Sequence, residues 1–154
     1  MWNCRGLGNL VTEKELGDLI RARLKTIKHK LNFDHMFFVP RIHRGRGLVR
    51  FWKESMGLRM ETSSKSHINC IIGGGSEGAR RFTGFYGEPT THKRHESWSL
   101  LRQLNNQFDL PWLCAGDFNE IVRGSEKKGG SSRSHAQMQL FRDAIDECGS
   151  LDMG

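Results

Sequence analysis

The feature that most constrains the fold is the alternation of short strand-like runs with longer segments of helical spacing. The strand-like runs are residues 36–39, 48–52, 58–62, 67–72, 80–86 and 110–115. Apolar residues keep helical spacing over 12–31, 91–108 and 134–148. Interleaved strands and helices predict an α/β or α+β fold. Because turn signals join most neighbouring strands as hairpins, we expect largely antiparallel sheets with helices packed outside them.

The composition favours a single basic domain. A length of 154 residues suits one domain, and an apolar fraction of 36% predicts a thin core. The 24 Lys and Arg residues outnumber the 17 Asp and Glu residues, which gives a formal charge of +7. A basic surface fits a polyanionic partner, and DNA or another nucleic acid is the commonest one. The alternative is that the positive charge serves only solubility.

The cysteines and the hydropathy pattern indicate an intracellular protein. The four cysteines are far apart and form no C-x-x-C pair, so reduced core thiols are expected rather than a zinc or redox motif. No apolar run reaches the length of a membrane span, and no signal peptide begins the chain. We therefore expect no membrane partner and no secretion, with the nucleus as a candidate compartment.

The two terminal helical segments carry start signals. Thr12 with Glu15, and Ser134 with Gln137, fit the capping-box pattern in which side chains bond backbone N–H groups at a helix start. The first segment, 12–31, is basic and amphipathic. It is interpreted mainly as a surface helix with a solvated basic face, and a phosphate- or membrane-contacting helix is the alternative.

One run, Pro111–Glu120, combines a buried strand with polar groups. Its apolar part ends at Gly116, and Asp117 and Asn119 follow two residues apart. Alternation along an extended backbone places both side chains on one face at the strand end. A carboxylate beside an amide suits a phosphate that needs a metal and a hydrogen-bond donor. The alternative is ordinary turn punctuation.

Two more polar side chains fall at expected strand ends. Asn3 follows a first extended segment, and Tyr86 lies in Phe85-Tyr86-Gly87. An amide can orient a metal or a water, and a phenol can donate a hydrogen bond to a phosphate oxygen. Turn formation and packing at the edge of the core are the alternatives for Asn3 and Tyr86.

A set of short motifs follows in order along the chain. The motifs are Trp2-Asn3-Cys4-Arg5-Gly6, Arg46-Gly47-Leu48 with Trp52-Lys53, Thr83-Gly84-Phe85-Tyr86-Gly87, Arg94-His95-Glu96-Ser97-Trp98, Gly116-Asp117-Phe118-Asn119-Glu120, Glu126-Lys127-Lys128-Gly129-Gly130, and Phe141-Arg142-Asp143-Ala144 with Cys148-Gly149. This ordered set resembles the endonuclease domain of plant non-LTR (LINE-type) retrotransposons, within the endonuclease/exonuclease/phosphatase superfamily. The resemblance covers nearly the whole chain, as one partial domain over 1–154.

The resemblance implies a four-layer sandwich, two mixed and largely antiparallel sheets flanked by helices. It also implies Mg²⁺-dependent hydrolysis of a DNA phosphodiester. Asn3 and Asp117 would then lie at the metal, with Asp117 as general base or water-positioning residue. Tyr86 would contact the scissile phosphate, and Asn119 would orient phosphate or water.

Two pieces of the family pattern are missing. The family's metal-binding Glu follows a strand after the first helix, but here the helical pattern runs unbroken to Leu31. Met60-Glu61-Thr62 has the same residues as that Glu tripeptide, but it comes after Trp52-Lys53, where the family has a plain strand. The match is therefore interpreted as coincidental. The family's later Asp and Ser-Asp-His segment is also not found in 1–154. His92 and His95 are not expected to replace it, because their spacing fits a helix surface.

These departures predict an incomplete fold, weak Mg²⁺ binding and a domain of retroelement origin with little or no nuclease activity. Two alternatives are a non-catalytic basic remnant that binds nucleic acid and a retroelement fragment with no selected role.

Overall fold

The computed structural model describes residues 13–41, 46–74, 78–129 and 132–150. Asn3, Thr12 and the first extended segment therefore lie outside the described residues. The contacts divide the chain into two compact units, Met1–Met56 and Gly57–Gly154. The single partial domain expected over 1–154 and the stacking of its layers stay predictions.

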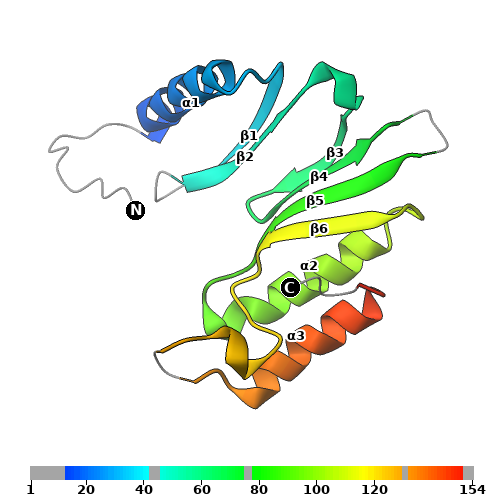
Figure 1. The fold of residues 1–154 in the computed structure, drawn as a ribbon. Coiled ribbons are helices and arrows are strands. Elements are labelled where there is room, and N and C mark those ends of the chain that lie inside the picture. The colour runs from blue at the N-terminus through cyan, green and yellow to red at the C-terminus, as the bar shows by residue number, and fades with distance from the viewer. Residues whose placement is uncertain (1–12, 42–45, 75–77, 130–131, 151–154) are drawn as a thin grey trace, which may run out of the picture. The chain divides into compact units, whose positions relative to one another are not determined.

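The first unit is a helix followed by a hairpin (Figure 1). It contains α1 (Glu13–Lys30), β1 (His35–Arg41), β2 (Arg46–Trp52) and the 3₁₀ turn η1 (Glu54–Met56). The helix packs against β1, and the two strands pair antiparallel. Since α1 is one uninterrupted helix that leads directly into β1, the prediction that no strand interrupts this part of the chain is confirmed.

β1 is longer than the sequence predicts, because Pro40 does not end it. Pro40 pairs with Gly47 in the two-stranded sheet, where a strand has an outer edge that needs no N–H donor. A Cβ on Gly47 would lie 2.5 Å from the Val39 carbonyl oxygen. The missing side chain at Gly47 therefore lets the two backbones approach beside the proline.

The second unit is a four-stranded sheet with two main helices (Figure 1). Its strands are β3 (Arg59–Ser64), β4 (His67–Ile72), β5 (Arg80–Tyr86) and β6 (Trp112–Asp117), adjacent in that order. The first three form an antiparallel meander, and β6 pairs parallel to β5. The helical elements are η2 (Thr91–Lys93), α2 (Arg94–Asn105), η3 (Gly124–Glu126) and α3 (His135–Glu147).

The core of the second unit lies between one face of this sheet and the two helices. Phe85 of β5 clusters with Trp98 of α2 and Phe141 of α3. The rings of Trp98 and Phe141 stack with centroids 4.5 Å apart. Burying such aromatic surface provides much of the driving force for folding. The residues of this cluster are Phe85, Trp98, Leu101, Leu104, Phe141 and Ala144.

The predicted α+β class with two sheets is confirmed, and most elements form where the spacing places them. The segment 91–108 begins as 3₁₀ turn and ends its α-helix at Asn105. The capping-box prediction at α3 is wrong for the Ser134 side chain, because the Ser134 carbonyl, and not its hydroxyl, accepts from the N–H groups of Gln137 and Met138. Within the described ranges, no helix combines the length and the apolar character needed to cross a bilayer.

Candidate functional site

The parallel pairing of β5 with β6 brings Tyr86 and Asp117 together. These two residues are register partners at the carboxyl ends of their strands. The pairing continues one step further, where the Gly87 N–H donates to the Asp117 carbonyl oxygen at 2.7 Å. Side chains from two segments far apart in sequence therefore meet at one edge of the sheet, here called the Tyr86–Asp117 edge.

Both side chains project from the sheet face opposite α2 and α3. Along β5 the buried residues Arg81, Thr83 and Phe85 alternate with partly exposed ones, and Tyr86 belongs to the second set. Asp117 is exposed and shares its face of the sheet with Tyr86, because the two are paired. The helical core thus supports the edge from behind and leaves its polar groups uncovered by these helices.

Two glycines make the close approach at this edge possible. A Cβ on Gly116 would lie 1.8 Å from the Phe85 carbonyl oxygen, and a Cβ on Gly87 would lie 2.1 Å from the Phe118 carbonyl oxygen. Gly116 also has φ +152°, a region that side chains rarely adopt. The glycines flanking the two polar residues are therefore required by the backbone.

A tight turn fixes Asn119 next to Asp117. The Asn119 N–H donates to Asp117 Oδ1 at 2.9 Å, and Asn119 has the left-handed φ of +56° that Asn tolerates. Asn119 Nδ2 donates to the Gly87 carbonyl oxygen at 2.8 Å, which ties the turn back to β5. The structure thus brings together three of the predicted site residues, Tyr86, Asp117 and Asn119, and the fourth, Asn3, lies outside the described residues.

A buried ion cluster, which the sequence did not reveal, anchors this turn. Glu120 Oε2 accepts from Arg94 Nη1 at 2.7 Å, and Glu120 Oε1 lies 3.4 Å from Arg133 Nε. The side chain of Glu120 is 0% exposed and that of Arg94 is 6% exposed. Both residues stood in recognised motifs, but nothing in their spacing signalled the contact. The cluster joins the residue after Asn119 to the start of α2.

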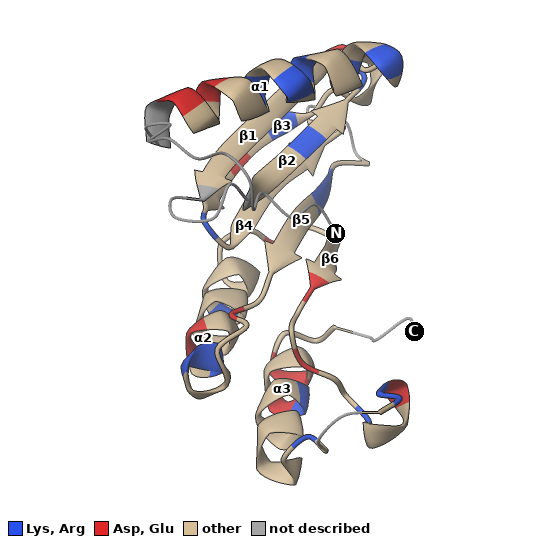
Figure 2. Cartoon of the chain, turned by 90° about the vertical axis from the view of Figure 1, so that its left-hand side faces the viewer, with Lys and Arg blue, Asp and Glu red and all other residues tan. Residues whose placement is uncertain are grey.

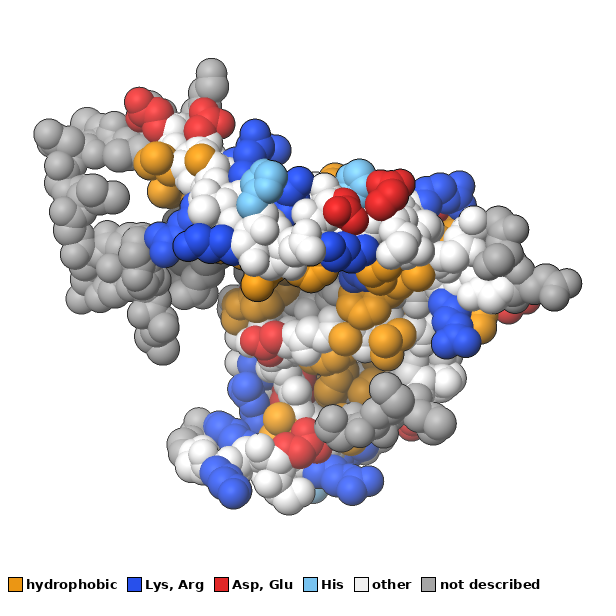
Figure 3. Space-filling model, turned by 45° about the horizontal axis from the view of Figure 1, so that its top comes forward, with side chains coloured by type: hydrophobic (Ala, Val, Ile, Leu, Met, Phe, Trp, Pro, Cys, Tyr) orange, Lys and Arg blue, Asp and Glu red, His pale blue; other side chains and the backbone are white. Residues whose placement is uncertain are grey.

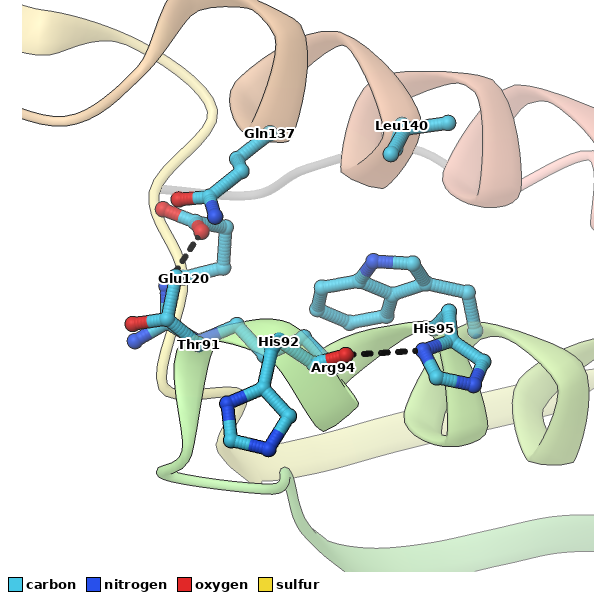
Figure 4. Close-up of a pocket in the computed structure, with 8 residues that line it drawn as sticks. Thr91, His92, Arg94, His95, Glu120, Gln137 and Leu140 are labelled. Atoms are coloured by element: carbon cyan, nitrogen blue, oxygen red, sulfur yellow. Dashed lines mark hydrogen bonds and ion pairs between the residues drawn. The ribbon is translucent and has the colours of Figure 1, made fainter.

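A small pocket borders the ion cluster (Figure 4). Its volume is about 200 Å³, and its lining includes His92, His95 and Trp98. The two histidines are exposed, and the His95 ring nitrogen Nδ1 lies 3.1 Å from the His92 carbonyl oxygen. His95 is therefore engaged with the backbone of its own turn.

A second polar cluster that the sequence did not predict lies in the β3–β4 hairpin. His67 is 6% exposed, its Nδ1 lies 2.9 Å from Ser64 Oγ, and its Nε2 lies 3.2 Å from Thr62 Oγ1. Burial lowers the pKa of His67 below its ordinary value of 6.5. His67 is the register partner of Phe85, so its side chain lies on the helix side of the sheet and does not face Tyr86.

The described residues alone do not complete a magnesium site. They contain no group of three or more His, Cys, Asp or Glu side chains placed to hold a metal ion. Glu61 is on β3, at the opposite side of the sheet from β6, and its carboxylate pairs with Arg59 at 2.9 Å. Strand spacing then puts Glu61 about 14 Å from β6. Of the predicted site residues that the structure describes, Asp117 is the one with a carboxylate at the edge.

Comparison with known proteins adds no identification, since neither the models of known protein families nor the curated proteins contain a match to this chain.

Proposed function

We propose that this chain is an endonuclease-type domain of a plant LINE-like retroelement that binds nucleic acid at the Tyr86–Asp117 edge and cleaves it slowly or not at all. The observation that carries the proposal is the parallel register that pairs Tyr86 with Asp117 and holds Asn119 beside them. The sequence motifs and this geometry agree on the same three side chains.

Each side chain has a defined role in this proposal. The Tyr86 hydroxyl donates a hydrogen bond to a phosphate oxygen. The carboxylate of Asp117 accepts a proton from, or orients, a water molecule near that phosphate. Asn119 keeps the turn in place, since its side-chain N–H group is already bonded to Gly87. A nucleic acid bound at this edge fits the formal charge of +7.

Weak or absent cleavage follows from the small number of metal ligands. Mg²⁺ requires about six oxygen ligands in a well-defined octahedron, and it stays hydrated and poorly fixed when a protein offers one carboxylate. α1 leads directly into β1, so the described chain between them offers no strand-borne glutamate. When bound, the ion would stabilise developing negative charge on the phosphate, and losing that contribution removes most of the rate.

The alternative of a basic domain that binds nucleic acid without cleaving it shares the same partner. It is favoured by the lack of a group of three or more possible metal ligands among the described residues, and it differs from the first proposal only in the rate of hydrolysis. A domain of either kind would act where the retroelement meets DNA, which in a plant cell includes the nucleus.

The test uses the one tyrosine of the chain as a reporter. Fluorotyrosine incorporated into the full chain gives a single ¹⁹F resonance, which we expect to shift when a short DNA duplex is added. A Phe82→Leu variant, altered on the same strand away from the edge, should show the same shift. A resonance that stays in place at saturating DNA would overturn the assignment of this edge.

Cleavage is measured separately on supercoiled plasmid with Mg²⁺. We expect wild-type nicking to be slow or absent, and any nicking above background to be lost in Asp117→Ala. Fast nicking that Asp117→Ala abolishes would contradict the proposed weak activity and establish a working endonuclease instead.

A further inference from the structure

The charges of α1 are segregated along the helix. Its first part carries Glu15 and Asp18, whereas residues 21–30 contain five Lys or Arg residues and no acid. Figure 2 shows the same change from red to blue along the helix. The second half of α1 therefore carries five basic residues with no acidic residue among them.

Three of these cations form a row, which we call the basic stripe: Arg21, Lys25 and Lys28. Positions i, i+4 and i+7 lie on one face of a helix, and Arg21 and Lys25 are about 6 Å apart along its axis. Arg21 and Lys25 are exposed and make no ion pair with any other described residue. Lys28 Nζ donates to the Asp34 carbonyl oxygen at 2.8 Å.

The stripe lowers the stability of its own helix. Like charges at i, i+4 repel, and this costs about 0.2–0.5 kcal/mol for each pair. Interaction with the helix dipole offsets such repulsion only within the last turn, which here contains Lys28, His29 and Lys30. Arg21 and Lys25 lie before that turn, so the helix dipole does not offset their repulsion. A polyanion bound along the stripe would offset it.

We propose that the basic stripe is a second nucleic-acid contact, in which Arg21, Lys25 and Lys28 bind successive backbone phosphates. A DNA strand presents one phosphate about every 3.4 Å along the duplex axis, so long cationic side chains spaced by one helical turn reach separate phosphates. In the space-filling view, basic side chains are exposed over much of the visible face, among acidic and histidine side chains (Figure 3). The contact reads charge and not base sequence.

A nucleic acid fits this surface better than an anionic membrane. An amphipathic helix binds a membrane by burying its apolar face in the lipid. The apolar positions of α1 include Ile20, Leu24 and Ile27, which are partly buried, and the helix packs against β1. That apolar face packs against the strand, and Leu19, which is 59% exposed, is the large apolar side chain of α1 that lies in solvent beside the charged face.

The proposal takes its nucleic-acid partner from the proposed function, but it concerns a different surface. The test is the salt dependence of binding between the full chain and a fluorescein-labelled DNA duplex, followed by anisotropy. We expect Arg21→Gln and Lys25→Gln each to reduce the slope of log K against log[salt] by about one, and the double variant by about two. Arg80→Gln removes one exposed charge elsewhere and should leave the slope unchanged.

Circular dichroism provides the folding control, because removing the repulsion should leave the helix content unchanged or higher. A double variant that is folded and has the wild-type slope would overturn the stripe proposal, even if DNA still shifts the fluorotyrosine signal. Conversely, a tyrosine resonance that does not shift, together with a reduced salt slope in the stripe variants, would overturn only the Tyr86–Asp117 assignment. Loss of binding to phosphatidylserine vesicles without a change in DNA binding would also contradict the stripe proposal.

Discussion

Glu120 is the residue on which the candidate site depends most. Its side chain is fully buried, accepts a hydrogen bond from Arg94 and pairs with Arg133, and the residue directly follows Asn119. A buried ion pair seldom adds much net stability, because desolvation offsets the attraction, but removing one partner leaves the other charge uncompensated. We therefore regard Glu120 as a positioning residue for the turn that holds Asp117 and Asn119.

Replacing Glu120 with Gln should destabilise the protein strongly. The change keeps the shape but leaves the Arg94 cation buried without a counter-charge, at a cost of about 3–5 kcal/mol. Urea unfolding followed by circular dichroism measures it. Glu147→Gln is the control, because Glu147 pairs with Arg102 on the surface and is 55% exposed, and its loss should be far smaller. Equal losses in the two variants would show that burial does not decide the effect.

Gly116→Ala should be poorly tolerated. The new methyl group would meet the Phe85 backbone oxygen at 1.8 Å, and backbone cannot move aside as a side chain can. We expect a loss of about 2 kcal/mol or more together with reduced DNA binding at the edge. In Gly124→Ala the added group meets nothing within 4 Å, so stability should stay within about 0.5 kcal/mol of wild type. A stable Gly116→Ala protein would refute the close approach of β5 and β6.

At the scale of residues, the sequence could predict which side chains form the Tyr86–Asp117 edge. It could not predict the buried ion cluster that holds the turn in place. Strand alternation places Asp117, but the prediction that an extended backbone carries Asn119 on the same face is wrong, because β6 ends at Asp117 and Asn119 lies in a turn with φ +56°. The contact of Arg94 with Glu120 joins a helix start to a turn after a strand, and only tertiary folding creates it.

At the scale of elements, boundaries were predictable where a strand is bounded by clear turn residues. β4 and β5 have the predicted limits because polar or glycine-rich segments end both apolar alternations. β1 runs past Pro40 since an edge position lacks the hydrogen bond that proline would break. α2 starts at Arg94 and not at the predicted residue 91, because residues 91–93 form a 3₁₀ turn first. Apolar spacing does not distinguish a 3₁₀ turn from the first turn of an α-helix.

The β3–β4 hairpin should make stability depend on pH. Because burial lowers the pKa of His67 in the folded state, the unfolded chain takes up a proton first. The stability that neutral His67 provides is complete above 6.5, the ordinary pKa of histidine, and is lost as the pH falls from there toward the lowered folded pKa.

Urea unfolding near neutral pH and at about pH 5 measures this loss. His67→Gln should flatten the pH dependence, whereas His92→Gln, at an exposed position, should leave it as in wild type. If both variants keep the wild-type dependence, His67 is not its source.

On the scale of the whole molecule, the hydrophobic core is unevenly distributed. Every buried hydrophobic residue among the described ones lies between Ile68 and Ala144, in the second unit. The described apolar residues of the first unit are partly or fully exposed, including Leu19 at 59%. The low apolar fraction of the chain predicted a thin core, but the composition could not say that one unit holds every buried hydrophobic residue of the described ranges.

Backbone amides of the two units should therefore exchange hydrogen at different rates. Few buried contacts mean a small free energy of local opening, so amides of α1 and β1 should exchange roughly an order of magnitude or more faster than those of β4 and α2. Hydrogen–deuterium exchange with mass spectrometry on the full chain measures both sets at once. Uniform protection across the two units would contradict this uneven distribution.

The single parallel pairing in the four-stranded sheet also sets an order of assembly. Hairpin contacts in β3, β4 and β5 are local and close quickly, whereas β6 reaches β5 only after the whole segment containing α2 has folded back. We expect the meander to be present early, with β6 added last. Tyr86 and Asp117 meet only at that final step, so a partly folded chain with a nearly complete sheet still lacks the candidate site.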